Sequence, residues 1–243
     1  TTSINLTAAL AEAGKKVLVI DIDPQGNTTS GFGIDKNDLD DTVYELMLGE
    51  CSINDCIIKD VLPNISVLPS NVNLAAAEIE LIGIERKEYI LKNEVDYVKE
   101  QYDYILIDCP PSLSMLTVNA MTTATSVLVP IQCEYFALEG LSQLIASVRQ
   151  VKRLYNPRLE LEGVLLTMFD SRTNLSVQIA QEIKRFFPQK VFSVTIPRNV
   201  RLAEAPSHGK PVMEYDRHSR GADCYMRLAE ELIDKNEEVR KNG

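Results

Sequence analysis

Short runs of apolar, mostly β-branched residues recur along the chain, and stretches with helical periodicity separate most of them. The runs are KVLVID (16–21), ISVLPS (65–70), YDYILIDCP (102–110), TSVLVPI (125–131), LEGVLLTMFD (161–170) and VFSVTIP (191–197). Each run is almost entirely apolar rather than alternating, as a strand covered on both faces requires. Strands that alternate with helices favour an α/β fold with a doubly wound, mostly parallel sheet and helices on both faces.

The expected helices lie between these runs. They are LTAALAEAG, NLAAAEIELIG, EYILKNEVDYVKEQ, LSMLTVNAMTTA, LEGLSQLIASVRQVKRLY, LSVQIAQEIKRFF and ADCYMRLAEELIDKNEEVRK. No repeat or linker interrupts the pattern, so we expect residues 1–243 to form a single domain. No apolar run approaches the ~18 residues that span a bilayer, and the first residues do not resemble a secretion signal. We therefore expect a soluble, cytoplasmic protein, unless a leader was removed.

Acidic residues follow two of the expected strands. Asp21 and Asp23 end the first run, and Asp108 ends the third. In parallel sheets the ligand binds beyond the carboxyl ends of the strands, where an aspartate often holds Mg²⁺ beside a nucleotide phosphate. Phosphate hydrolysis needs one carboxylate near the metal and another that orients the attacking water. The alternative is that these aspartates are helix caps or turn residues.

The opening TTSINL enters a helix directly. Thr1, Thr2 and Ser3 would form its first turn, where hydroxyls and free amides can bind a phosphate. Ordinary N-terminal capping by the same residues is an equally good interpretation.

Charge is distributed unevenly along the chain. Residues 1–150 carry 9 Lys and Arg against 22 Asp and Glu (net −13), and residues 151–243 carry 16 against 13 (net +3). Nine basic residues lie between Arg172 and Arg220, and they form either a local basic face or part of a mixed solvated surface. No base-reading motif appears, so any DNA binding would rest on phosphate neutralisation.

The cysteines and methionines are interpreted as structural residues rather than as ligands. The five cysteines (Cys51, Cys56, Cys109, Cys133 and Cys224) form no CxxC pair, and we expect reduced thiols. Cys109 and Cys133 are interpreted as buried apolar thiols rather than iron–sulfur ligands. Met115, Met121 and Met168 are expected in the core.

Five long segments together carry a resemblance to a known family. VLVIDIDPQGNTTSGFG, YDYILIDCPPSLSMLTVNAM, VPIQCEYFALEGLSQL, GVLLTMFDSRTNLS and TIPRNVRLAEAPSHGKPVMEYDRHSRGADCY closely resemble, in order and spacing, the ParA/Soj-type chromosome- and plasmid-partitioning ATPases. The resemblance runs from residue 1 to about residue 232. It implies a P-loop-type, deviant Walker ATPase that binds ATP and Mg²⁺ and dimerises around the nucleotide. It also implies DNA binding without sequence preference, association with the nucleoid, and stimulation of hydrolysis by a ParB-type centromere-binding partner.

The resemblance also implies roles for individual residues. Asp23 would orient the attacking water, Asp108 would hold Mg²⁺ through a water, and Asp21 would support that site. Thr1 and Thr2 match the threonines that follow the Mg²⁺-binding hydroxyl residue of the phosphate loop. The remaining matches would border the adenine (Pro197, Arg198 and Asn199) or contact DNA (Arg172, Arg201 and, more weakly, Lys210).

One departure from the family is large. The family's phosphate loop reads KGGVGKT directly before a stretch like TTSINL, and residues 1–243 contain neither that loop nor the strand before it. We expect these residues, as they stand, to bind ATP poorly, and we expect the intact chain to begin earlier. The alternatives are a MinD-like membrane-associated ATPase, which the mixed-charge tail disfavours, and a non-hydrolysing DNA-binding or scaffold protein.

Overall fold

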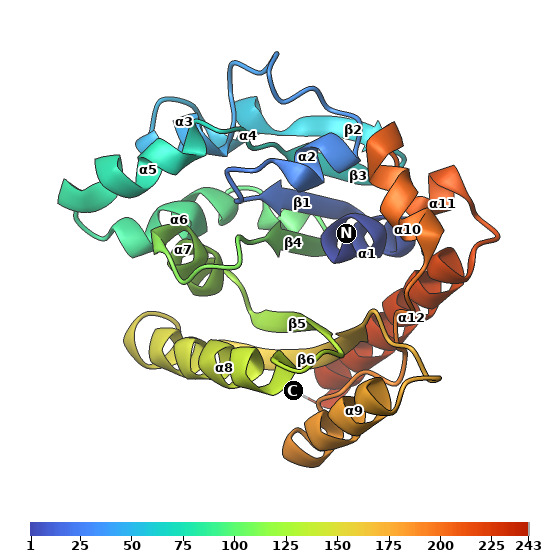
Figure 1. The fold of residues 1–243 in the computed structure, drawn as a ribbon. Coiled ribbons are helices and arrows are strands. Elements are labelled where there is room, and N and C mark those ends of the chain that lie inside the picture. The colour runs from blue at the N-terminus through green and yellow to red at the C-terminus, as the bar shows by residue number, and fades with distance from the viewer. Residues whose placement is uncertain (243) are drawn as a thin grey trace.

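A computed structural model describes residues 1–242 and has an α/β architecture in which helices surround mostly parallel strands (Figure 1). The strands are β1 Val17–Asp21, β2 Ile58–Leu62, β3 Ile65–Leu68, β4 Tyr104–Asp108, β5 Ser126–Gln132 and β6 Glu160–Thr167. They form a four-stranded sheet with the order β2-β3-β1-β4 and a two-stranded sheet, β5-β6. Only β2 pairs antiparallel among these strands. The expected fold class is confirmed.

The helices occupy most of the intervals between the strands. The α-helices are α1 Thr2–Glu12, α2 Asn27–Gly31, α3 Val43–Leu48, α4 Ile53–Cys56, α5 Leu74–Glu80, α6 Ile90–Val95, α7 Met115–Thr123, α8 Ala137–Leu154, α9 Asn174–Phe186, α10 Val200–Glu204, α11 Val212–Tyr215 and α12 Arg220–Asn242. The 3₁₀ turns are η1 Leu81–Gly83, η2 Lys87–Tyr89, η3 Lys99–Gln101 and η4 Ala205–His208. Within residues 1–242, none of these helices combines the length and apolar character needed to cross a bilayer.

Strand β1 is buried on both faces, which explains its unbroken apolar sequence. Val17 and Val19 pack in a core that includes α1 and α12, whereas Leu18 and Ile20 pack in a second core with α3 to α7. Both faces of this strand are therefore covered by helices, as its composition predicts.

Strands β4 and β5 follow one another in the sequence but belong to different sheets. Strand β4 is the last of its sheet, and its residues are only half buried, in contrast to the fully buried β1. Strand β5 pairs with β6 in parallel over its whole length, and the pair packs against α8 and α9. Among residues 1–242, no strand pairs with both β4 and β5.

Two details of the strand prediction are wrong. Strand β2, a short antiparallel strand, was not expected from the sequence, because the polar Lys59 and Asp60 interrupt its apolar residues. Residues 191–197 were expected to be a strand, but they contribute only isolated bridges, from Val191 to Val164 and from Pro197 to Phe169. Phe192, Val194 and Ile196 of this segment are buried, but the segment forms no continuous ladder.

The expectations for cysteine and methionine were partly wrong. Cys51 and Cys56 form a disulfide, whereas we expected five reduced thiols. Met115 and Met121 pack in apolar clusters as expected, but Met168 is 39% exposed. Its φ of 52° places it in a turn directly after β6, which directs the side chain out of the core.

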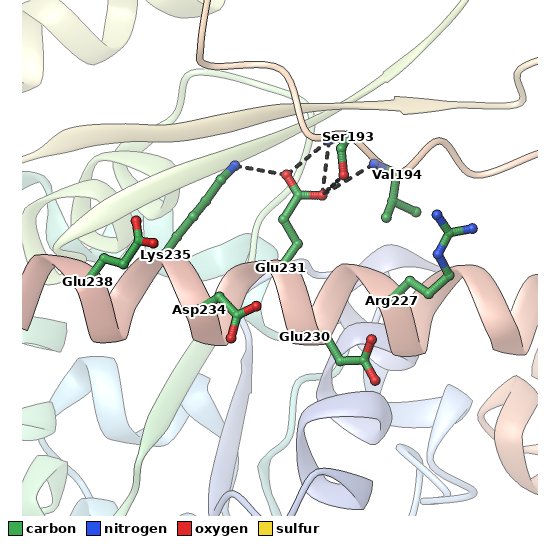
Figure 2. A pocket seen from close by; sticks show the side chains of 8 residues that line it. All are labelled: Ser193, Val194, Arg227, Glu230, Glu231, Asp234, Lys235 and Glu238. Atoms are coloured by element: carbon green, nitrogen blue, oxygen red, sulfur yellow. Dashed lines mark hydrogen bonds and ion pairs between the residues drawn. The ribbon is translucent and has the colours of Figure 1, made fainter.

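A carboxylate clamp joins the C-terminal helix to the segment after β6. Figure 2 shows a surface pocket in which Glu231 of α12 is surrounded by Ser193, Val194 and Lys235. Its carboxylate accepts hydrogen bonds from the Ser193 amide (2.9 and 3.0 Å), the Ser193 hydroxyl (2.6 Å) and the Val194 amide (3.3 Å), and it pairs with Lys235 at 3.1 Å. Burial acts to raise the pKa of Glu231, but these bonds outweigh it and lower the pKa.

We expect Glu231→Gln to lower the free energy of unfolding at neutral pH by about 1–3 kcal/mol, because one amide oxygen cannot replace all these bonds. A lowered pKa means that the stabilisation is present above the unfolded-state pKa and is lost as the pH falls through the folded-state pKa. Urea unfolding should therefore show a difference at pH 7 that shrinks as the pH is lowered through the range in which carboxylates protonate. Glu230→Gln, at an exposed neighbouring position, is the control. A difference that stays constant over this pH range would contradict the clamp.

Candidate functional site

Adjacent parallel strands bring two of the predicted carboxylates side by side. Asp21 at the end of β1 is the register partner of Asp108 at the end of β4. The Ile22 amide then donates to the Asp108 carbonyl at 2.9 Å, which continues the ladder beyond the two acids. The site therefore begins as a pair of carboxylates at one edge of the four-stranded sheet.

Asp21 is fully buried and strongly hydrogen-bonded. One carboxylate oxygen accepts from both the amide and the hydroxyl of Thr29 at 2.8 Å, and the other accepts from the Asp23 amide at 3.2 Å. Burial raises the pKa of Asp21 from 3.8 to about 6; the hydrogen bonds from Thr29 oppose this rise, and the negative charge of Asp108 adds to it. Asp21 therefore holds the loop after β1 against the start of α2.

Asp108 accepts hydrogen bonds from residues of two helices. The Ser3 hydroxyl in the first turn of α1 donates to one of its oxygens at 2.5 Å. The Thr28 hydroxyl in α2 donates to the other at 2.6 Å. The N-terminal turn of α1, where free amides and the positive end of the helix dipole lie, is thus fixed beside this carboxylate.

Asp23 lies in the turn between Asp21 and α2 and is half buried. Its carboxylate accepts from the Gln25 amide at 3.0 Å, and its carbonyl accepts from the Ser70 hydroxyl at 2.9 Å. The turn requires Gly26, which has φ of 59° and whose added Cβ would lie 2.8 Å from the Ser70 carbonyl oxygen. The turn thereby holds Asp23 at the same sheet edge as Asp21.

The donor atoms of this cluster suit a hard cation. Carboxylate and hydroxyl oxygens are the ligands that Mg²⁺ prefers, usually few in number and completed by water and phosphate. Within residues 1–242 there is no group of three or more His, Cys, Asp or Glu that could form an all-protein metal cage. The cluster therefore fits a magnesium ion shared with a phosphate ligand.

The predicted threonines lie at the start of α1. Thr1 is its exposed N-cap residue and makes no side-chain capping bond. The Thr2 hydroxyl shares a hydrogen bond of 3.1 Å with the buried Tyr225 of α12. Asn5, one turn later, accepts from the Val212 amide at 2.7 Å. These contacts tie the first turn of α1 to the C-terminal helices.

The residues predicted to border adenine lie at the start of α10. Pro197 forms the bridge with Phe169, and Asn199 is the N-cap of α10, where its side chain accepts from the Arg201 amide at 2.9 Å. Arg198 is exposed. No hydrogen bond among residues 1–242 joins these three residues to the carboxylate cluster, so their nucleotide role stays a prediction.

The arginines predicted to contact DNA are engaged by carboxylates of their own chain. Arg172 is 87% exposed and makes a two-point contact with Asp170 at 2.8 and 2.9 Å, which lowers the pKa of Asp170 to about 2. Arg201 pairs with Glu204 at 2.8 Å and with Asp216 at 3.1 Å. Part of the positive charge counted in the sequence is thus neutralised within the fold.

Lys210 is exposed and follows a close contact between two loops. A Cβ added to the preceding Gly209 (φ 62°) would lie 2.7 Å from the Cα of Gly33, just after α2. The segment that carries Thr28 and Thr29 therefore abuts the loop of Lys210. This contact links the carboxylate cluster physically to the basic segment.

Three hydroxyl residues of the site were not expected from the sequence. Thr28 and Thr29 hold the two aspartates, and the Ser70 amide donates to the Thr29 hydroxyl at 2.9 Å. The pair of threonines directly after DPQGN was the available signal for the first two. Ser70 follows β3 and could be placed only once the order of the strands was known.

Two of the free thiols, Cys109 beside Asp108 and Cys133 after β5, are weakly acidic. Burial and the neighbouring charges of Asp108, Asp21 and Asp23 raise the pKa of Cys109 to about 12. Burial alone raises the pKa of Cys133 to about 11. Both thiols stay protonated at neutral pH, which supports the interpretation of small apolar residues.

The raised pKa of Asp21 predicts a pH-dependent loss of stability. The folded state binds the Asp21 proton more tightly than the unfolded chain does. Ionisation of Asp21 therefore lowers the free energy of unfolding, and this loss is absent below about pH 4 and complete above about pH 6. Its full size is on the order of 3 kcal/mol, because one pKa unit corresponds to about 1.4 kcal/mol. Measured without divalent cations, the unfolding free energy of Asp21→Asn relative to wild type should therefore rise over this range.

Thr29→Val provides the matched control for this prediction. It removes one hydrogen bond to the ionised form of Asp21, and should move the same transition to higher pH. Parallel pH profiles for wild type and Asp21→Asn would show that Asp21 does not titrate in this way.

The chain is similar to proteins of known family. A family model described as an AAA domain matches residues 1–161. The sporulation initiation inhibitor protein Soj of Bacillus subtilis is 53% identical over 232 residues, covering 96% of this chain and 92% of Soj. The chromosome partitioning protein ParA of Caulobacter vibrioides is 48% identical over 237 residues, covering 97% and 89%.

A solved structure extends the similarity to three dimensions. Cobyrinic acid a,c-diamide synthase from Mycobacterium smegmatis, with a bound ATP analogue and magnesium, has a TM-score of 0.83 and 34% identity. The match covers 96% of this chain and 87% of the synthase. Because that protein is named as a synthase, the likeness concerns the fold and says nothing about partition. On the sequence similarity to Soj and ParA, the chain belongs to the family of the Soj and ParA chromosome-partitioning ATPases.

Proposed function

We propose that this protein is an ATPase that segregates DNA and uses ATP and Mg²⁺. The observation that carries the proposal is the junction at Asp108, where the hydroxyls of Ser3 and Thr28 and the N-terminal turn of α1 meet a strand-end carboxylate. A helix N-terminus favours phosphate, and the oxygen donors beside it suit magnesium. The bound ATP analogue and magnesium of the structurally similar synthase support the same interpretation.

Each carboxylate has a distinct task in this proposal. Asp108, with the hydroxyls of Ser3 and Thr28, would hold Mg²⁺, through a water in the case of the carboxylate. The chemistry that a bound Mg²⁺ would supply here is positive charge beside the phosphates during hydrolysis. Asp23 orients the attacking water, and Asp21 acts as a positioning residue because it accepts the Asp23 amide. Thr1 and Thr2 lie at the phosphate end, and Pro197, Arg198 and Asn199 border the adenine.

Asp23→Asn in the native protein should lower the ATP turnover number by about a hundredfold or more while ATP still binds. Asp108→Asn should instead raise the Mg²⁺ concentration needed for half-maximal turnover. Turnover is measured by phosphate release with DNA and partner present, and nucleotide affinity with a fluorescent ATP analogue. Asp103→Asn, at the opposite end of β4, is the control. If Asp23→Asn hydrolysed ATP as fast as wild type, Asp23 would have no role in the mechanism. If the wild type itself hydrolysed no ATP, the protein would instead be a non-hydrolysing DNA-binding protein.

The DNA-related part of the proposal rests on the C-terminal basic segment. ATP-dependent dimerisation would double the basic surface that carries Arg172, Arg201 and Lys210, and a ParB-type partner would stimulate hydrolysis and release. The protein would then act in the cytoplasm on the nucleoid. Because Arg172 and Arg201 are paired with carboxylates, DNA phosphates must compete with Asp170, Glu204 and Asp216 for them.

Because of this competition, substitutions of the two partners of the Arg172–Asp170 ion pair should have opposite effects on DNA affinity. Arg172→Ala should weaken binding to DNA of any sequence and reduce the slope of log affinity against log salt by about 1. Asp170→Asn should strengthen binding, because it frees Arg172. Arg201→Ala should behave like Arg172→Ala. Filter binding at several salt concentrations, with ATP present, measures both effects. Unchanged affinity and salt slope in Arg172→Ala and Arg201→Ala would refute DNA contact by this segment.

A further inference from the structure

Helix α5 and the turn η1 that follows it carry apolar residues on two opposite faces. Leu74, Ala77 and Leu81 are fully buried and pack in the core beneath β1. The opposite face carries Val72, Ala75, Ile79 and Ile82, which we call the α5 stripe. Val72 is 73% exposed, Ile79 73% and Ile82 68%.

The α5 stripe has the geometry of one helical seam. Its residues are separated by three, four and three positions, which is the spacing that keeps side chains on one line along a helix. The stripe begins in the turn before α5, where the Ala75 amide bonds the Val72 carbonyl at 3.2 Å, and ends in the 3₁₀ turn η1, where the Ile84 amide bonds the Leu81 carbonyl at 3.2 Å. The stripe is therefore a continuous apolar seam rather than scattered exposed residues.

Such a seam is normally covered. A helix that is apolar on both sides belongs in an interior, and exposed apolar patches commonly mark interaction sites. Helix α5 lies at one edge of the molecule, well away from α9 to α12 (Figure 1). The basic C-terminal segment of the same chain is therefore not its cover.

Carboxylates beside the stripe define the chemistry of its partner. Glu78 lies one helical turn from both Ala75 and Ile82, and Glu85 follows Ile82 by three residues; both are exposed. No ion pair among residues 1–242 neutralises either of them, and the nearby Lys87 donates to the Ile82 carbonyl at 3.1 Å. A second copy would bring its own carboxylates against these, which disfavours self-association through this face. The complementary surface is apolar with basic flanks.

We propose that the α5 stripe docks a short amphipathic helix of another protein, with an apolar seam against Ile79 and Ile82 and Lys or Arg beside Glu78 and Glu85. This is pairing of one helix against another, in which apolar anchors supply affinity and flanking charges supply selectivity. The proposal does not depend on ATP or DNA binding, since none of these residues belongs to the carboxylate cluster or the basic segment.

The test uses a fluorescent synthetic helix of about three heptads, with leucine at a and d and lysine at e and g, titrated with the native protein in an anisotropy assay. Ile79→Gln/Ile82→Gln should weaken binding about tenfold or more, because anchor residues dominate such interfaces. Glu78→Gln/Glu85→Gln should weaken it several-fold at low salt and flatten its salt dependence. Leu175→Gln/Phe186→Gln, an exposed apolar pair on α9, is the matched control and should bind as wild type does.

Two results would overturn the proposal. One is equal affinity in wild type and Ile79→Gln/Ile82→Gln, or equal affinity for a scrambled peptide with no apolar seam. The other is wild-type self-association in sedimentation that Ile79→Gln/Ile82→Gln abolishes, because the occupant would then be a second copy of this chain. All substituted positions are exposed, and circular dichroism checks that each variant keeps its fold.

Discussion

The parallel pairing of β1 with β4 is the interaction on which the rest of the site depends. It makes Asp21 and Asp108 register partners. Two neighbouring carboxylates repel one another, so both stay ionised only because surrounding groups donate hydrogen bonds to them. Thr29 and the Asp23 amide stabilise one carboxylate, and Ser3 and Thr28 stabilise the other. The loop after β1 and the starts of α1 and α2 are thereby held at one sheet edge.

Contacts outside the cluster join that edge to the C-terminal elements. Thr2 bonds Tyr225, Asn5 accepts from the Val212 amide, and Gly33 meets Gly209 backbone to backbone. Helix α1 therefore contacts α11 and α12 directly, and the segment after α2 contacts the residue that follows η4. The carboxylate edge and the basic segment are thus joined by direct contacts.

Much of the fold and part of the site could be predicted from local sequence. The apolar runs located β1, β3, β4, β5 and β6; in the fully buried β1, helices cover both faces and leave little room for polar side chains. Residues 191–197 have the same composition but form only isolated bridges, since strand formation also needs a partner in register. The disulfide of Cys51 and Cys56 was missed because spacing alone does not reveal the turn that brings the two sulfurs together.

The sequence by itself determined the family, the fold class and the positions of the strand-end acids, because these follow from local periodicity and from motifs of contiguous residues. Only the tertiary structure decided what each side chain contacts. It placed Thr28 on Asp108, paired Arg201 with Asp216, and left Ile79 and Ile82 uncovered. Such pairings join residues from separate elements, so they depend on strand order and helix packing, which no local stretch of sequence specifies.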